Sequence, residues 1–105
     1  RPTGIVAFND DTAIAIMMAA KDMGIKIPEE LSIIGYDNIS ISNILLKPLT
    51  TISVPIHNMG INAGKKIIQI IDNSISYSDT YREEYIPYKL IERESVKSMD
   101  IDSWI

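Results

Sequence analysis

Two short apolar runs, each closed by a polar pair, constrain the fold of this chain most strongly. The first run is residues 4–8 (GIVAF), followed by residues 9–10 (ND), and the second is residues 31–36, followed by residues 37–38 (DN). The first run is continuously apolar, which is typical of a strand that is buried on both faces, as in a parallel sheet, and the second run also fits a strand. Residues 11–23 between the runs are rich in helix formers. The pattern therefore predicts a strand, a helix and a parallel strand joined by a right-handed crossover.

The rest of the chain contains further patterns typical of strands and helices. Residues 48–54 are expected to form a third strand, and residues 85–94 a last strand that Pro87 places at an edge or marks at its start. Residues 39–46 are apolar and fit either a short helix or an irregular loop. Residues 56–73 have helical spacing with one apolar side. The fold class expected is α/β, with a mostly parallel sheet and flanking helices.

The apolar side of that second helix consists of Gly60, Ala63, Gly64, Ile67, Ile68 and Ile71. Residues 74–84 are polar and show no period, so they predict a loop in which Tyr77 and Tyr81 are exposed or half-buried. Nothing in the sequence indicates whether the tail, residues 96–105, is ordered.

Charge and residue usage exclude several classes of function. The chain has 105 residues and a net charge of -4, and its longest basic cluster is Lys65 with Lys66. Nucleic-acid affinity needs several clustered cations, so this chain by itself is not expected to bind DNA well. With no cysteine and a single histidine, His57, neither a disulfide framework nor a zinc site is expected. Because the chain starts at Arg1 almost directly in a strand-like run, we expect it to be a fragment of a longer protein.

The polar pairs that end the first two strands are the best candidates for a binding site. Ligands of open α/β sheets bind beyond the carboxyl ends of the strands, where Asn9 and Asp37 lie in the sequence. A carboxylate and an amide suit the vicinal hydroxyls of a sugar or the N–H edge of a purine. The structural alternative is that Asp10 is a helix N-cap and that Asn9 and Asp37 are cap or turn residues. A Mg²⁺ site using Asp10, Asp11 and Asp37 lacks any lysine or glycine-rich phosphate cradle beside it.

The helix expected over residues 11–23 is unusual because residues 13–20 (AIAIMMAA) leave no polar side over two turns. Such a helix is expected to be buried all round. One side covers the sheet, and the other side meets either a second subunit or another part of the same protein. Residues 39–46 add apolar surface nearby in the sequence.

Six segments, taken in order, resemble the C-terminal region of LacI/GalR transcription regulators, and they cover nearly the whole chain. The segments are residues 2–10 (PTGIVAFND) with Ala13, residues 24–29 (GIKIPE), residues 32–38 (SIIGYDN), residues 48–52 (PLTTI), residues 59–60 (MG) with Ala63, and residues 90–95 (LIERES).

The resemblance implies part of a periplasmic-binding-protein-like type I core, in which two lobes enclose a small effector and an N-terminal helix-turn-helix head binds the DNA operator. Residues 1–54 and 85–95 would belong to the C-terminal lobe. Residues 55–84 would be the crossover helix and loop towards the N-terminal lobe, and residues 96–105 a tail. The expected protein is a cytoplasmic, homodimeric repressor controlled by a sugar-like effector, with no membrane contact, no catalytic role, no metal and no cofactor.

Matching positions imply that Asn9 and Asp37 contact the effector. Some members of the family place a ligand-binding glutamine where this chain has Val54, which suggests a different effector or a more apolar corner of the pocket. The implied dimer interface consists of Ile14, Met17, Met18, Ile44 and Leu45. Two alternatives remain: an extracytoplasmic sugar-binding protein of a transporter, and an enzyme that uses Asp10 and Asp37.

Overall fold

The helices and strands follow one another in the expected order in the computed structural model, which describes residues 1–76, 78, 84–100 and 102. Tyr77 and Tyr81 of the predicted loop, and the last residues of the tail, lie outside this part of the chain. The elements are β1 (Gly4–Val6), α1 (Asp10–Asp22), β2 (Ser32–Tyr36), the 3-10 helix η1 (Ser40–Asn43), β3 (Thr50–Ser53), α2 (Ile56–Ile71) and β4 (Lys89–Ile91).

The chain divides into two compact units. The first unit contains Arg1–Ser53 and Lys89–Ile105, and the second contains Val54–Tyr88. The sheet and α1 belong to the first unit, whereas α2 belongs to the second. The assignment of these segments to the two lobes of a larger core stays a prediction.

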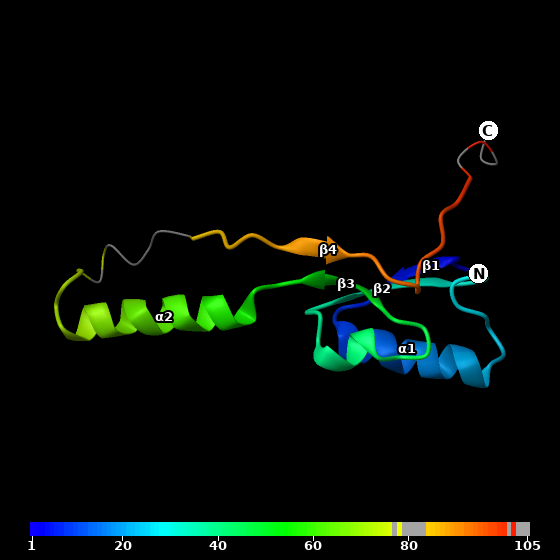
Figure 1. Cartoon of the computed structure of the whole chain (residues 1–105), viewed down its shortest axis with the longest axis horizontal. Helices are drawn as coiled ribbons and strands as arrows, with labels where there is room; N and C mark the ends of the chain where they lie inside the picture. The colour runs from blue at the N-terminus through cyan, green and yellow to red at the C-terminus, as the bar shows by residue number, and fades with distance from the viewer. Residues whose placement is uncertain (77, 79–83, 101, 103–105) are drawn as a thin grey trace. The chain divides into compact units, whose positions relative to one another are not determined.

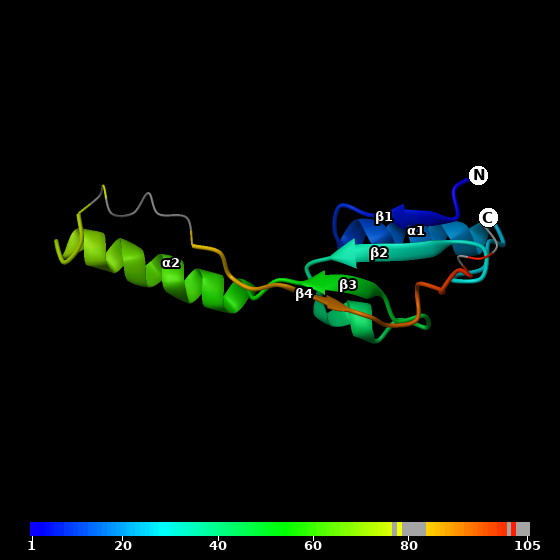
Figure 2. The same ribbon diagram turned by 90° about the horizontal axis from the view of Figure 1, so that it is seen from above.

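A mostly parallel sheet organises the first unit, which confirms the predicted fold class. The strands lie in the order β1-β2-β3-β4, as Figure 2 shows from above. β1, β2 and β3 are parallel, with Ile5 paired to Ile33 and Gly35 paired to Thr51, and β4 runs antiparallel to β3. The last strand is shorter than the predicted residues 85–94, since β4 contains only Lys89–Ile91.

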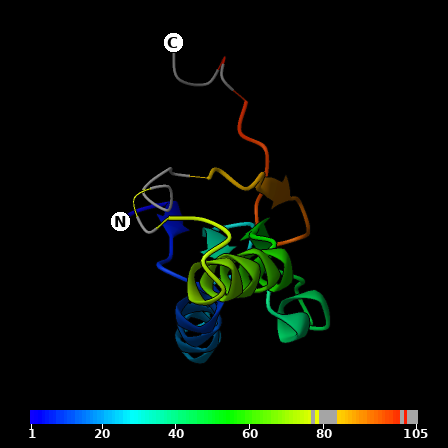
Figure 3. The same cartoon turned by 90° about the vertical axis from the view of Figure 1, so that its left-hand side faces the viewer.

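One face of the sheet holds the core. α1 and η1 lie on the same side of the strands (Figures 1 and 3). The buried core consists of Ala7, Ala13, Leu31, Ile33 and Leu49. On the opposite face Val6 is 80% exposed, and Phe8, just beyond β1, is 87% exposed. The expectation that the first strand is buried on both faces was therefore wrong for this chain, because α1 covers only one face.

Helix α1 is also less buried than its sequence predicts. Only Asp10, Ala13 and Ala20 are buried, and Met18 is 65% exposed. The sheet takes one side of the helix, and within the described residues the outer side keeps its apolar side chains in solvent. The helix of the second unit behaves similarly, because no residue of α2 is buried. No helix in the described part of the chain is both long and apolar enough to cross a membrane.

The start of α1 differs from the sequence-based prediction in a way that affects the whole first unit. Asn9, not Asp10, is the N-cap: its Oδ1 accepts a hydrogen bond from the Thr12 amide at 2.9 Å. Asp10 is instead fully buried, with 0% exposure. Its Oδ1 accepts a hydrogen bond from the Thr51 hydroxyl at 2.6 Å and its Oδ2 one from the Ile39 amide at 2.9 Å. One carboxylate thus joins α1, β3 and the turn that follows β2.

Gly35 makes room for this carboxylate. A Cβ atom at position 35 would lie 2.2 Å from Asp10 Oδ1 and 2.9 Å from a methyl group of Leu49. Since both neighbours are packed in the core, only glycine fits at this point of β2.

The segment after β4 holds the opposite ends of the strands. The buried Ser95 hydroxyl donates to the Ile33 carbonyl at 2.6 Å and accepts from the Thr50 amide at 2.8 Å. The Ile33 amide in turn donates to the Ser95 carbonyl at 2.8 Å. The segment therefore fastens β2 to β3 although it forms no strand itself.

Replacing Asp10 with alanine should lower the free energy of unfolding by about 3 kcal/mol, because the Ile39 amide and the Thr51 hydroxyl lose a charged acceptor in the core. Urea titration followed by circular dichroism measures this change. Asp11→Ala, next to it on the exposed side of α1, is the control and should cost no more than about 1 kcal/mol. Equal effects of the two substitutions would contradict a structural role for the buried carboxylate.

Candidate functional site

The two predicted ligand-binding residues lie beyond the same edge of the sheet. Val6 of β1 is the register partner of Ile34 of β2, and the two strands are parallel. Asn9 and Asp37 each lie three residues further along, so both follow the carboxyl ends of neighbouring strands. This edge is where open α/β sheets bind small ligands.

Asp37 lies in a turn with an unusual backbone. Both Asp37 (φ 104°) and Asn38 (φ 55°) have positive φ angles, which aspartate and asparagine tolerate better than other side chains. The Asp37 amide donates to the Ile52 carbonyl at 2.9 Å. Within the described part of the chain, the carboxylate of this half-buried residue has neither a hydrogen-bond donor nor a cation as partner. The carboxylate is therefore available to a ligand.

Asn9 offers the complementary group. Capping occupies its Oδ1, and its Nδ2 group has no acceptor among the described residues. The capping alternative for Asn9 is thus correct for one atom of the amide, and the remaining N–H groups can still donate. At this end of the sheet the Asp37 carboxylate is thus a free acceptor and the Asn9 amide a free donor. Hydroxyl groups of a ligand suit this pair, because a hydroxyl can both donate and accept a hydrogen bond.

The structure gives no support to a metal-dependent enzyme site. Both carboxylate oxygens of Asp10 accept hydrogen bonds from the protein, and the side chain is fully buried. Asp11 is exposed on α1. The described residues contain no group of three or more His, Cys, Asp or Glu side chains that could hold a metal ion.

Side chains from two other segments form hydrogen bonds with the turn after β2, and their residue types alone did not mark them as part of the site. The Asn38 amide donates to Thr51 Oγ1 at 3.3 Å, and Asn38 Nδ2 donates to Ser53 Oγ at 3.4 Å. Arg93 Nη2 donates to Asn38 Oδ1 at 2.7 Å. The only sequence signal for this arginine was its place in residues 90–95, one of the segments that resemble LacI/GalR regulators.

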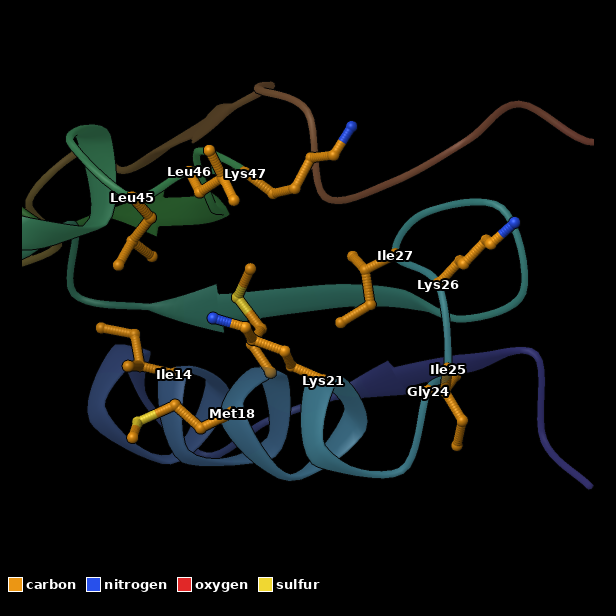
Figure 4. Close-up of a pocket in the computed structure, with 11 residues that line it drawn as sticks. Ile14, Met18, Lys21, Gly24, Ile25, Lys26, Ile27, Leu45, Leu46 and Lys47 are labelled. Atoms are coloured by element: carbon orange, nitrogen blue, oxygen red, sulfur yellow. The ribbon is translucent and has the colours of Figure 1, made fainter.

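A second feature is an apolar groove of about 470 Å³ beside α1 (Figure 4). Ile14 and Met18 on α1 form one side of it, Leu45 and Leu46 lie across from them, and Ile27 lies at one end. The remaining lining residues are Met17, Lys21, Gly24, Ile25, Lys26 and Lys47.

The groove brings together four of the five residues predicted for a dimer interface, namely Ile14, Met17, Met18 and Leu45. Ile44 does not line it, although its side chain is 78% exposed. Three lysines, Lys21, Lys26 and Lys47, also line the groove.

Known proteins resemble this chain over most of its length. The model of the periplasmic binding protein-like domain matches residues 1–96. The PurR transcriptional repressor of Vibrio atlanticus is 35% identical over 95% of this chain and 29% of its own length. The ribose operon repressor of Halalkalibacterium halodurans is 42% identical over 90% of this chain and 28% of its own length. The chain therefore spans less than a third of these relatives.

Solved structures of LacI family regulators are similar to this chain as well. A LacI family transcriptional regulator from Enterococcus faecalis with bound ribose is 34% identical to this chain and superposes with a TM-score of 0.85. The match covers 95% of this chain and 36% of the length of that regulator. The lac repressor dimer bound to operator has a TM-score of 0.79 at 23% identity, which shows the shared fold. These relatives confirm the resemblance to LacI/GalR regulators, and they are regulators by name, not enzymes. The chain belongs to the periplasmic binding protein-like domain family.

Proposed function

We propose that this chain is the effector-sensing and self-associating part of a DNA-binding transcriptional repressor that a small sugar controls. The observation that supports this best is the Asp37 carboxylate, which has no protein partner in the described part of the chain and follows the same end of the sheet as the free amide group of Asn9. An unpaired carboxylate just beyond the carboxyl end of a parallel strand, where small ligands of open α/β sheets bind, fits a ligand that donates hydrogen bonds to it.

Sugar recognition fits these groups. Two adjacent hydroxyls of a pentose can donate to both oxygens of Asp37, while the Asn9 amide donates to a third oxygen. Ribose is the first ligand to test, because a ribose operon repressor and a ribose-bound LacI family regulator are both similar to this chain.

Regulation would depend on parts outside the first unit. The crossover helix and loop, residues 55–84, would lead towards the N-terminal lobe of the complete protein, and a sugar contacted by both lobes of that protein would favour one arrangement of the lobes over the other. Operator binding would be the task of an N-terminal helix-turn-helix head, since this chain has a net charge of -4 and no basic cluster suited to DNA. Such a repressor acts in the cytoplasm, without a catalytic residue or cofactor. The similar proteins favour this function over a transporter component, because they are regulators.

The apolar groove beside α1 would be covered by a second copy of the chain. Met18 and Leu46 are largely exposed there, and a two-fold interface buries the same apolar patch on both copies. α1 has acidic residues in its first turn and Lys21 in its last turn. Two antiparallel copies of the helix would therefore bring Lys21 of one copy towards Asp11 of the other.

Asp37→Ala in the protein made from its complete gene should weaken D-ribose binding by about 1.5 to 3 kcal/mol, because the charge-assisted hydrogen bonds are lost. Isothermal titration calorimetry measures the change. Asp22→Ala, an exposed aspartate at the far end of α1, serves as the control and should bind like the wild type. Undiminished binding by Asp37→Ala would remove this residue from the site.

Met18→Glu should weaken self-association by at least about tenfold, because a carboxylate would lose its hydration in an apolar interface. Sedimentation equilibrium measures the dissociation constant. Ala19→Glu adds the same charge to an exposed neighbouring position that does not line the groove, and it should associate normally. A dimer that tolerates Met18→Glu would place the interface elsewhere.

A further inference from the structure

Arg93 reaches from the segment after β4 into the turn that carries Asp37. Its guanidinium group donates three hydrogen bonds: Nη1 to Ser42 Oγ at 2.8 Å, Nη1 to the Leu49 carbonyl at 2.9 Å, and Nη2 to Asn38 Oδ1 at 2.7 Å. Its backbone amide donates to Thr50 Oγ1 at 3.0 Å. Both the backbone and the side chain of this half-buried residue are therefore held in place.

All three acceptors of the guanidinium group are neutral. No carboxylate in the described part of the chain forms an ion pair with Arg93. An arginine that served only to balance charge would face a carboxylate, whereas the planar guanidinium group of Arg93 links two side chains and one backbone carbonyl from three segments of the chain. A lysine side chain has a single nitrogen, so it cannot replace both Nη1 and Nη2 and make all of these hydrogen bonds.

The hydrogen-bond lengths single out Arg93 among the groups that hold Asn38. The contacts of Asn38 with Thr51 and Ser53, at 3.3 and 3.4 Å, are at the long end of the range for hydrogen bonds. The contact with Arg93, at 2.7 Å, is short and charge-assisted. Since Asp37 and Asn38 both have positive φ angles, their conformation needs support from the surroundings.

We propose that Arg93 is a positioning residue of the effector site. It does not touch the ligand; it holds Asn38 so that the preceding residue, Asp37, presents its carboxylate in the geometry that binds adjacent hydroxyls. The inference rests on the proposed sugar-binding function, and it adds a residue that lies 55 positions away from Asn38 in the sequence.

Ser95 provides the matched control, because it lies in the same segment and has a purely structural environment. Its buried hydroxyl joins the Ile33 carbonyl to the Thr50 amide, and it has no hydrogen bond to the turn. Ser95→Ala should lower the thermal midpoint but leave the affinity of the folded protein for sugar unchanged. Arg93→Lys should lower the affinity as well.

The test is a double-substitution cycle in the protein made from its complete gene, with D-ribose as the probe in calorimetry. Arg93→Lys should weaken binding by about tenfold, which is the scale of one charge-assisted hydrogen bond. In an Asp37→Ala background the same change should have little further effect, because the carboxylate that Arg93 positions is gone. Unchanged affinity in Arg93→Lys, or losses that simply multiply in the double variant, would overturn the proposal.

Amide hydrogen exchange provides a measurement without ligand. Arg93→Lys should speed exchange at residues 38 and 39 and leave residues 13–20 of α1 unaffected; equal rates in both proteins would overturn the proposal. If the wild type binds no sugar, the proposed function fails, while exchange still decides the role of Arg93. If Arg93→Lys does not fold, Asn38→Gly removes the acceptor while allowing the positive φ angle, and it should show the same loss of affinity and faster exchange at residue 39; normal values of both would overturn the proposal.

Discussion

The first unit depends on one buried carboxylate. Asp10 has no exposed surface, and removing a charge from water is costly unless hydrogen bonds replace the lost hydration. The Thr51 hydroxyl and the Ile39 amide provide those bonds, so β3 and the turn after β2 must approach the start of α1. The same demand explains the glycine at position 35, where any side chain would collide with the carboxylate. Because Asp10 points into the core, the capping of α1 is done by Asn9.

Two aspartates that follow neighbouring strands thus have opposite environments. Asp10 follows β1 and is satisfied by the protein, whereas Asp37 follows β2 and is left with its carboxylate unpaired. The first holds the turn from which the second projects, since the Ile39 amide bonded to Asp10 lies two residues after Asp37. The hydrogen bonds of the buried Asp10 keep the turn in place, and the Asp37 carboxylate on that turn has no protein partner among the described residues. A rigidly held group that is free to bind is what a ligand-binding site requires.

Much of this architecture could be predicted from the sequence, because its signals are local. The apolar runs, the helix formers between them and the polar pairs that close the strands indicated the order of elements and the parallel sheet. The choice of N-cap could not be predicted, since either Asn9 or Asp10 can cap a helix. Arg93 could not be found either, because its partners are 44 to 55 residues away in the sequence. The exposure of Val6 and Met18 depends on which surfaces cover the sheet and α1, and hydrophobicity alone does not reveal that.

We propose that Asp37, on the turn that Asp10 and Arg93 support, binds a sugar. The most direct test is a crystal structure of the complete gene product grown with the pentose or hexose that raises its thermal midpoint most. This binding mode predicts that two adjacent hydroxyls of the sugar lie within hydrogen-bond distance of the Asp37 carboxylate, with the turn and the buried Asp10 contacts unchanged. A sugar bound with its hydroxyls away from Asp37, or a turn rearranged so that Asp37 pairs with a protein cation, would contradict it.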